Sequence, residues 1–195
     1  MKHILLIALL FGVAPVTSAQ TANTGAGECK LTLSRVPAIR GIRLGMTLDQ
    51  VVALFPGAED DKELRAKLYQ THFGLQSSFI SPSKYGSKEN FAGVTLVYLG
   101  FLDGQLDLFT IHYDGPEWNS DVQFASVVAE ALKLPGVEFW KPVTGGLGIT
   151  CDGFEVTLSR AGPMIGMRNL QVDIDKIVRG REEERKERAR RAFKP

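Results

Sequence analysis

Two segments of the chain carry hydrophobic residues at helical spacing behind a polar capping residue. In the first, 45–57, Thr47 and Gln50 have the spacing of a capping box, and Pro56-Gly57 stops the pattern. Its apolar stripe recurs at i, i+3, i+4 and i+7 and consists of Leu48, Val51, Val52 and Phe55. The pattern predicts an amphipathic helix that begins at Thr47.

The second segment, further along the chain, has the same pattern of capping residue, apolar stripe and stop signal. Ser120 and Gln123 form the predicted box, and Leu134-Pro135-Gly136 ends the pattern. The stripe here consists of Phe124, Val127, Val128, Ala131 and Leu132. Two similarly bounded helices, each leading into strand-rich sequence, favour a tandem duplicated α/β unit, although two unrelated capped helices fit the same pattern.

The strongest strand signals are Val94–Leu102 and Gln105–Tyr113, which flank Asp103-Gly104. Asp-Gly between β-rich runs predicts a two-residue hairpin that places Leu102 opposite Gln105. In a regular ladder, one face then carries Val94, Leu96, Tyr98, Phe109, Ile111 and Tyr113. The other face carries Val97, Leu99, Phe101, Leu106 and Leu108. Because both faces are apolar, either other elements cover both or one face docks a partner.

Weaker signals complete an α+β prediction of two capped helices packed on an antiparallel sheet. Short strands are expected at 29–34, 74–80, 148–151, Phe154–Ser159 and 164–174, and a short helix at 60–70. The segment 179–195 holds eight basic and four acidic residues. Its favourable i,i+4 pairs are Glu182 with Lys186, Glu184 with Arg188 and Glu187 with Arg191. These features predict a charged C-terminal helix, either simply solvated or an arm for anionic envelope polymers.

The first residues predict export. Lys2-His3, the apolar run 4–13 and Thr17-Ser18-Ala19 are the parts of a secretory signal peptide with cleavage expected after Ala19. The run is too short for a permanent membrane span. The expected organisation is a signal peptide at 1–19, a flexible leader at 20–28, an α+β domain at 29–178 and a charged helical tail at 179–195. If duplicated, the domain divides into about 29–115 and 116–178.

Composition and cysteine content agree with a periplasmic or extracellular protein. Of 195 residues 44% are hydrophobic, and 23 Lys+Arg balance 22 Asp+Glu, so the charge footprint of a nucleic-acid binder is missing. The two cysteines, Cys29 and Cys151, are expected to form a disulfide. Two free buried thiols and zinc ligation are the alternatives, although only His72 and His112 follow the predicted cleavage site. We expect no metal, no cofactor and no integral membrane segment after cleavage.

The segment Gly45-Met46-Thr47 followed by Val51 resembles a signature of small exported modules. These are the SmpA/OmlA outer-membrane assembly lipoproteins and the β-lactamase-inhibitor-like proteins. The resemblance implies helices on an antiparallel sheet, sometimes in tandem, that act by protein–protein binding without catalysis. In that family the Gly lets the chain turn into the helix that the Thr caps. The chain departs from the assembly lipoproteins because it lacks a lipid-accepting Cys.

The sequence gives only weak indications of catalysis. The chain has no Gly-x-Ser-x-Gly elbow, His-Glu-x-x-His pair or phosphate-binding loop. His112 and Asp114 are the best acid–base candidates, and a small hydrolase is therefore one alternative. The other is an envelope-associated structural protein that uses the basic tail.

The sequence favours an exported, non-enzymatic protein-binding module whose partner is a protein or peptide of the cell envelope. Exposed loop aromatics are enriched at binding hot spots, and core packing is the alternative for Trp118 and Trp140. The candidate partner-binding residues are Tyr98, Phe109, Tyr113, Trp118 and Trp140.

Overall fold

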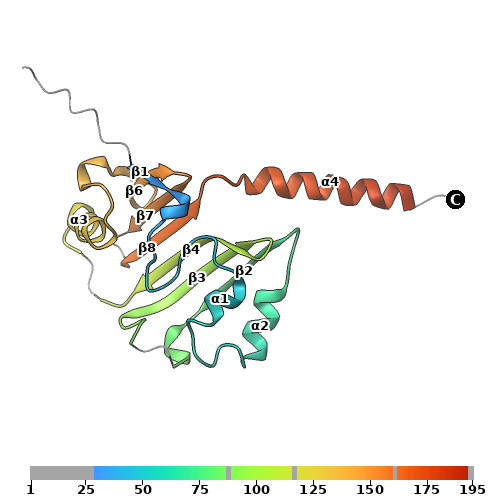
Figure 1. Cartoon of the computed structure of the whole chain (residues 1–195), viewed down its shortest axis with the longest axis horizontal. Coiled ribbons are helices and arrows are strands. Elements are labelled where there is room, and N and C mark those ends of the chain that lie inside the picture. Colours follow the sequence, from blue (N-terminus) through green and yellow to red (C-terminus); the bar gives the residue numbers. More distant parts are fainter. Residues whose placement is uncertain (1–28, 87–88, 116–117, 160–161, 193–195) are drawn as a thin grey trace, which may run out of the picture.

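A computed structural model describes residues 29–86, 89–115, 118–159 and 162–192, and Figure 1 shows its helices and strands. The helices in these residues are α1 (Leu48–Val52), α2 (Lys62–Tyr69), α3 (Asp121–Leu132) and α4 (Ile174–Ala192). The strands are β1 (Cys29–Thr32), β2 (Leu75–Ile80), β3 (Val94–Leu102), β4 (Gln105–Tyr113), β5 (Lys141–Val143), β6 (Gly146–Asp152), β7 (Phe154–Ser159) and β8 (Met164–Asn169). The predicted α+β class is confirmed.

The strands form one mixed, mostly antiparallel sheet in the order β1-β6-β7-β8-β4-β3-β2, with β5 paired to β6. It contains two antiparallel meanders, β2-β3-β4 and β6-β7-β8, and their last strands β4 and β8 pair antiparallel in the middle. Each meander follows at least one helix in the chain. Two copies of one unit joined through their last strands would produce this order, but strand order does not establish common origin, so duplication stays a prediction.

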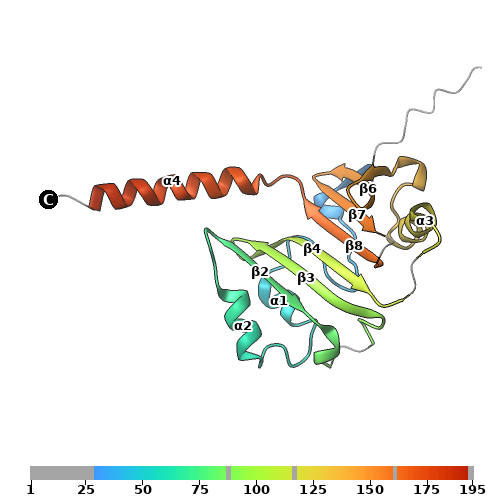
Figure 2. The same ribbon diagram turned by 180° about the vertical axis from the view of Figure 1, so that it is seen from behind.

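Helices cover one face of this sheet. One row of side chains crosses four central strands through the paired residues Phe109, Met167, Val156 and Ile149, and all are at most 2% exposed. Helices α1 and α2 lie beside β2-β3-β4, and α3 contacts β6 and β7 (Figures 1 and 2). We call this side the covered face and the opposite side the open face. Residues of the open face are Phe79, Leu96, Tyr98, Leu108, Thr110, His112, Thr157, Met164 and Arg168.

The β3–β4 hairpin has the predicted ends but a different register. Leu102 pairs with Gln105 as expected, but the register shifts at Asp107 and again at Thr95. Each shift is a β-bulge, which adds one unpaired residue to one strand and changes every later partner. The predicted faces are therefore wrong: Phe109 pairs with Leu99 on the covered face, whereas Leu96 and Tyr98 lie on the open face.

The predicted capping box at α1 is confirmed. Thr47 Oγ1 accepts a hydrogen bond from the Gln50 amide at 3.3 Å, and Gln50 Oε1 accepts one from the Thr47 amide at 2.9 Å. Gly45 has φ +81° and its amide donates to the Leu106 carbonyl, which anchors the helix start on the hairpin. The helix ends at Val52, earlier than predicted, yet Phe55 is fully buried and stacks on Phe91 with ring centroids 4.5 Å apart.

Helix α3 begins as predicted but presents a different stripe to the sheet. Ser120 Oγ accepts from the Gln123 amide at 3.1 Å. The buried residues are Phe124, Ala125, Val128 and Ala129, whereas Val127 is 46% exposed and Ala131 is also exposed. The prediction for Val127 and Ala131 is wrong because the helix turns its small alanines toward the sheet.

The charged tail helix is longer than predicted. Helix α4 begins at Ile174, so the expected boundary at 178/179 falls inside it, and it projects beyond the sheet (Figure 1). Arg181 donates to Asp103 at 2.5 Å and to the Phe73 carbonyl. Among the expected i,i+4 pairs, Glu182–Lys186 and Glu187–Arg191 form at 2.9 and 3.0 Å. The helix is therefore anchored at its first turns to the hairpin tip.

The predicted disulfide is confirmed, and it lies within the sheet. Cys29 of β1 and Cys151 of β6 are paired across the parallel ladder, both are buried, and their bond closes a sequence separation of 122 residues. The bond indicates an oxidising compartment. It also attaches the first described strand to the far end of the sheet.

Removal of this bond is expected to cost much of the stability. The C29A/C151A variant should lose about 5 kcal/mol of unfolding free energy, because a loop of this length is no longer closed in the unfolded chain. Urea denaturation of the variant and of the oxidised wild type measures the difference. A loss below about 1 kcal/mol would contradict this account.

Candidate functional site

The open face carries an aromatic pair at its β2 edge, in which Phe79 is exposed and Tyr98 is half-buried. Phe79 is 58% exposed, and its ring lies 4.9 Å from that of Tyr98, its cross-strand partner on β3. The same row continues across the sheet through Thr110, Gly166 and Thr157. Large aromatic surface therefore gives way to small and hydroxylated residues toward the sheet centre.

Two strand positions at the centre of the open face are glycine, Gly100 and Gly166. A Cβ at Gly100 would lie 3.0 Å from Leu108 Cγ, and a Cβ at Gly166 would lie 2.6 Å from Thr157 Oγ1. The neighbouring side chains thus occupy the space above both glycines. Beyond them, Arg168 pairs with Glu155 at 2.7 Å. An exposed aromatic side chain beside small polar residues and an ion pair is typical of protein interfaces rather than of small-molecule pockets.

The structure divides the predicted partner-binding residues among three places. Tyr98 lies on the open face. Phe109 is fully buried on the covered face, which corrects its assignment, and Trp140 is 6% exposed with its Nε1 donating to the Pro135 carbonyl at 3.2 Å. Tyr113 and Trp118 line a cavity beneath α3.

Sequence reasoning missed Phe79. The segment 74–80 is only a weak strand by pattern, and a single phenylalanine among serines gives little indication of its exposure. The available signal was alternation, since Phe79 and Ile80 must point to opposite faces of a strand. Ile80 is 1% exposed, so Phe79 is the residue that faces solvent.

The acid–base candidates lie in different surroundings. His112 is on the open face, where Leu96 and Met164 are its ladder partners, and its carbonyl accepts from Thr95 Oγ1. Asp114 follows the end of β4 and lines the cavity beneath α3, which His112 does not. Within the described ranges, no hydrogen bond or ion pair joins the two side chains.

The described residues contain neither a metal-binding cluster nor a membrane-spanning helix. No group of three or more His, Cys, Asp or Glu residues in the described segments is placed to hold a metal ion. Among the described helices, none has both the length and the apolar character needed to cross a bilayer.

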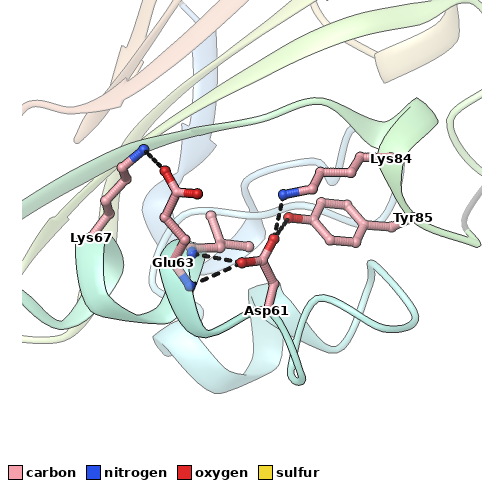
Figure 3. Close-up of polar contacts among 6 residues, drawn as sticks. Asp61, Glu63, Lys67, Lys84 and Tyr85 are labelled. Atoms are coloured by element: carbon pink, nitrogen blue, oxygen red, sulfur yellow. Dashed lines mark hydrogen bonds and ion pairs between the residues drawn. The ribbon is translucent and has the colours of Figure 1, made fainter.

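Asp61 has the most strongly perturbed carboxylate, and Figure 3 shows its partners. Its Oδ1 caps α2 by accepting from the amides of Glu63 and Leu64, both at 3.0 Å. Its Oδ2 accepts from Lys84 Nζ at 2.5 Å and from the Tyr85 hydroxyl at 2.9 Å. These hydrogen bonds, that of Lys84 above all, hold the pKa of Asp61 far below its usual range. The group clamps the start of α2 to the loop before β3, and its acceptors are occupied by protein.

Comparison with known proteins identifies no relative of this chain. No protein-family model matches it, and neither a curated protein nor a solved structure shows significant similarity to it.

The Asp61 clamp predicts a defined pH dependence of stability. Because folding lowers the pKa of this carboxyl, its stabilising contribution is complete above the unfolded value of about 3.9 and is lost as pH falls toward the folded pKa. D61N, which keeps a capping oxygen but removes the charge, should be less stable than wild type at neutral pH. The difference should shrink progressively below about pH 4.

Urea denaturation of both proteins between neutral and acidic pH measures this convergence. The D60N variant removes a neighbouring charge outside the clamp and is the matched control. Parallel stability profiles for wild type and D61N at every pH would contradict the proposed role of Asp61.

Proposed function

We propose that this chain is an exported, non-enzymatic module that binds a protein or peptide partner of the cell envelope on its open face. The observation that carries the proposal is the asymmetry of the sheet. Helices pack on one face, whereas the other presents the Phe79–Tyr98 pair to solvent. An aromatic pair of this kind contributes strongly to binding once a partner excludes water from it.

The chemistry of the open face defines the partner it suits. Leu96 and Leu108 are half-buried and extend the apolar area next to the aromatic pair. The Arg168–Glu155 ion pair supplies polar groups at the opposite end. A partner with a flat apolar patch and a polar margin would match both.

Export is supported by the composition of the first residues and by the disulfide. The signal peptide predicted at 1–19 lies outside the described residues. Cys29–Cys151 is consistent with passage into the periplasm or beyond. The resemblance at Gly45-Met46-Thr47 to envelope assembly and inhibitor modules favours binding over catalysis, since those families act through protein–protein contact.

Photo-crosslinking in intact cells tests the proposed surface. A benzophenone amino acid at Phe79 should yield a discrete adduct. The same amino acid at Tyr69, which is 45% exposed on α2, should not. The captured partner, purified and titrated against the wild-type module, should bind F79A at least about tenfold more weakly, because the substitution removes an exposed aromatic anchor.

Two outcomes would overturn the proposal. Equal adducts at Phe79 and Tyr69 would mean that capture follows exposure rather than the open face. Unchanged affinity of the purified partner for F79A would mean that the aromatic pair does not contribute to binding. Circular dichroism of F79A checks that its fold is intact, which is expected because Phe79 is largely exposed.

A further inference from the structure

A cavity of about 830 Å³ opens on the covered face, on the opposite side of the sheet from the proposed partner surface. It lies between α3, the turn at 38–40 and the end of β4. Its apolar walls come from Ile39, Tyr113, Trp118, Val127, Leu132 and Ile165. A cavity of this size and apolar character is within the range of small-ligand sites.

The packing of α3 explains why this space is not filled. The helix buries Phe124, Ala125, Val128 and Ala129, whereas Val127 lies at the cavity wall and is 46% exposed. Trp118 stacks on Phe124 with ring centroids 5.1 Å apart and forms part of the same wall. The apolar wall of the cavity is therefore formed by side chains that pack against one another.

The mouth of the cavity carries Arg40 in an unfavourable backbone conformation. Ile39 and Ile42 exchange two hydrogen bonds of 2.9 Å around a two-residue turn, in which Arg40 has φ +54° and Gly41 φ +86°. Turns with two positive φ values favour Asn-Gly or Asp-Gly. An arginine in the left-handed region costs about 1–2 kcal/mol, so this position holds a guanidinium despite the preference of the turn.

The guanidinium of Arg40 is available for an anion. It lies 5.9 Å from the centre of the Tyr113 ring and donates to the Ala92 carbonyl at 3.3 Å. Among the described residues it forms no ion pair, although Asp114 also lines the cavity. Burial raises the pKa of Tyr113, an effect that Arg40 partly offsets. The phenol therefore remains protonated at neutral pH.

We propose that this cavity binds a single-chain amphiphile with an anionic head group, of the fatty-acid class. The hydrocarbon chain would lie along Val127, Leu132 and Ile165, and its carboxylate would pair with Arg40 at the mouth. The apolar walls account for the hydrocarbon chain, and Arg40, which has no ion pair within the described segments, accounts for the sign of the head group.

Binding of laurate to the full chain tests the proposal. Isothermal titration below the critical micelle concentration should give one saturable site, with a change in tryptophan fluorescence from Trp118. Dodecyltrimethylammonium, which has a similar chain and a cationic head, should bind at least about tenfold more weakly than laurate. Dodecyl maltoside supplies the neutral head group for comparison.

Two variants distinguish the contacts of the ligand's hydrocarbon chain from the contact of its head group. V127Q should weaken laurate binding about tenfold because it removes an apolar wall. V122Q on the same helix is its matched control: Val122 is 55% exposed but does not line the cavity. R40N should weaken laurate about tenfold and leave dodecyl maltoside unchanged. It should also fold at least as stably as wild type, because Asn suits the turn.

Saturable laurate binding that is weakened by V127Q and by R40N, but not by V122Q, supports the proposal. The absence of saturable binding would overturn it. Equal binding of the anionic and cationic amphiphiles, or equal effects of V127Q and V122Q, would also overturn it. None of these results depends on the partner of the open face, so the two proposals fail separately.

Discussion

The antiparallel pairing of β4 with β8 is the contact on which the rest of the structure depends. It aligns Phe109 with Met167 and Ile111 with Ile165, so the buried faces of both meanders become one continuous surface. Each meander alone has three strands, which is near the lower limit for an independently stable sheet. Their union lets α1, α2 and α3 share one core, and none of these three helices packs on the opposite face of the sheet.

The two candidate surfaces follow from this one-sided arrangement. On the open face, Gly100 and Gly166 add no side chains to the central strands, and the aromatic pair lies at the β2 edge. On the covered face, α3 buries Phe124, Ala125, Val128 and Ala129, and a cavity lies between α3 and the loop that holds Arg40.

Local chemistry made part of this structure predictable from sequence. Thr47–Gln50 is a capping box, Asp103-Gly104 sets both hairpin ends, and Cys29–Cys151 is the bond that two cysteines in an exported chain favour. The bulges were not predictable, because they depend on neighbours distant in sequence. Asp107, the unpaired residue of one bulge, is buried and forms a hydrogen bond with Asn169 of β8. Burial raises the pKa of Asp107, and this hydrogen bond opposes the rise. The exposure of Phe79 and Val127 depends in the same way on which elements pack beside them, which no local pattern encodes.

The strongest pointers to function are residues that the fold alone does not favour. Asp103 and Arg40 are each the first residue of a two-residue turn whose second residue is glycine, and both have positive φ. Aspartate is a preferred residue there, and Asp103 also accepts from Arg181, so turn geometry and packing account for it. Arginine is not preferred, and among the described residues Arg40 contacts the Ala92 carbonyl and the Tyr113 ring but forms no ion pair. Phe79 is a parallel case, since a largely exposed phenylalanine adds little to folding. Positions that neither local preference nor global packing favours are where functional or strained sites are expected in a protein.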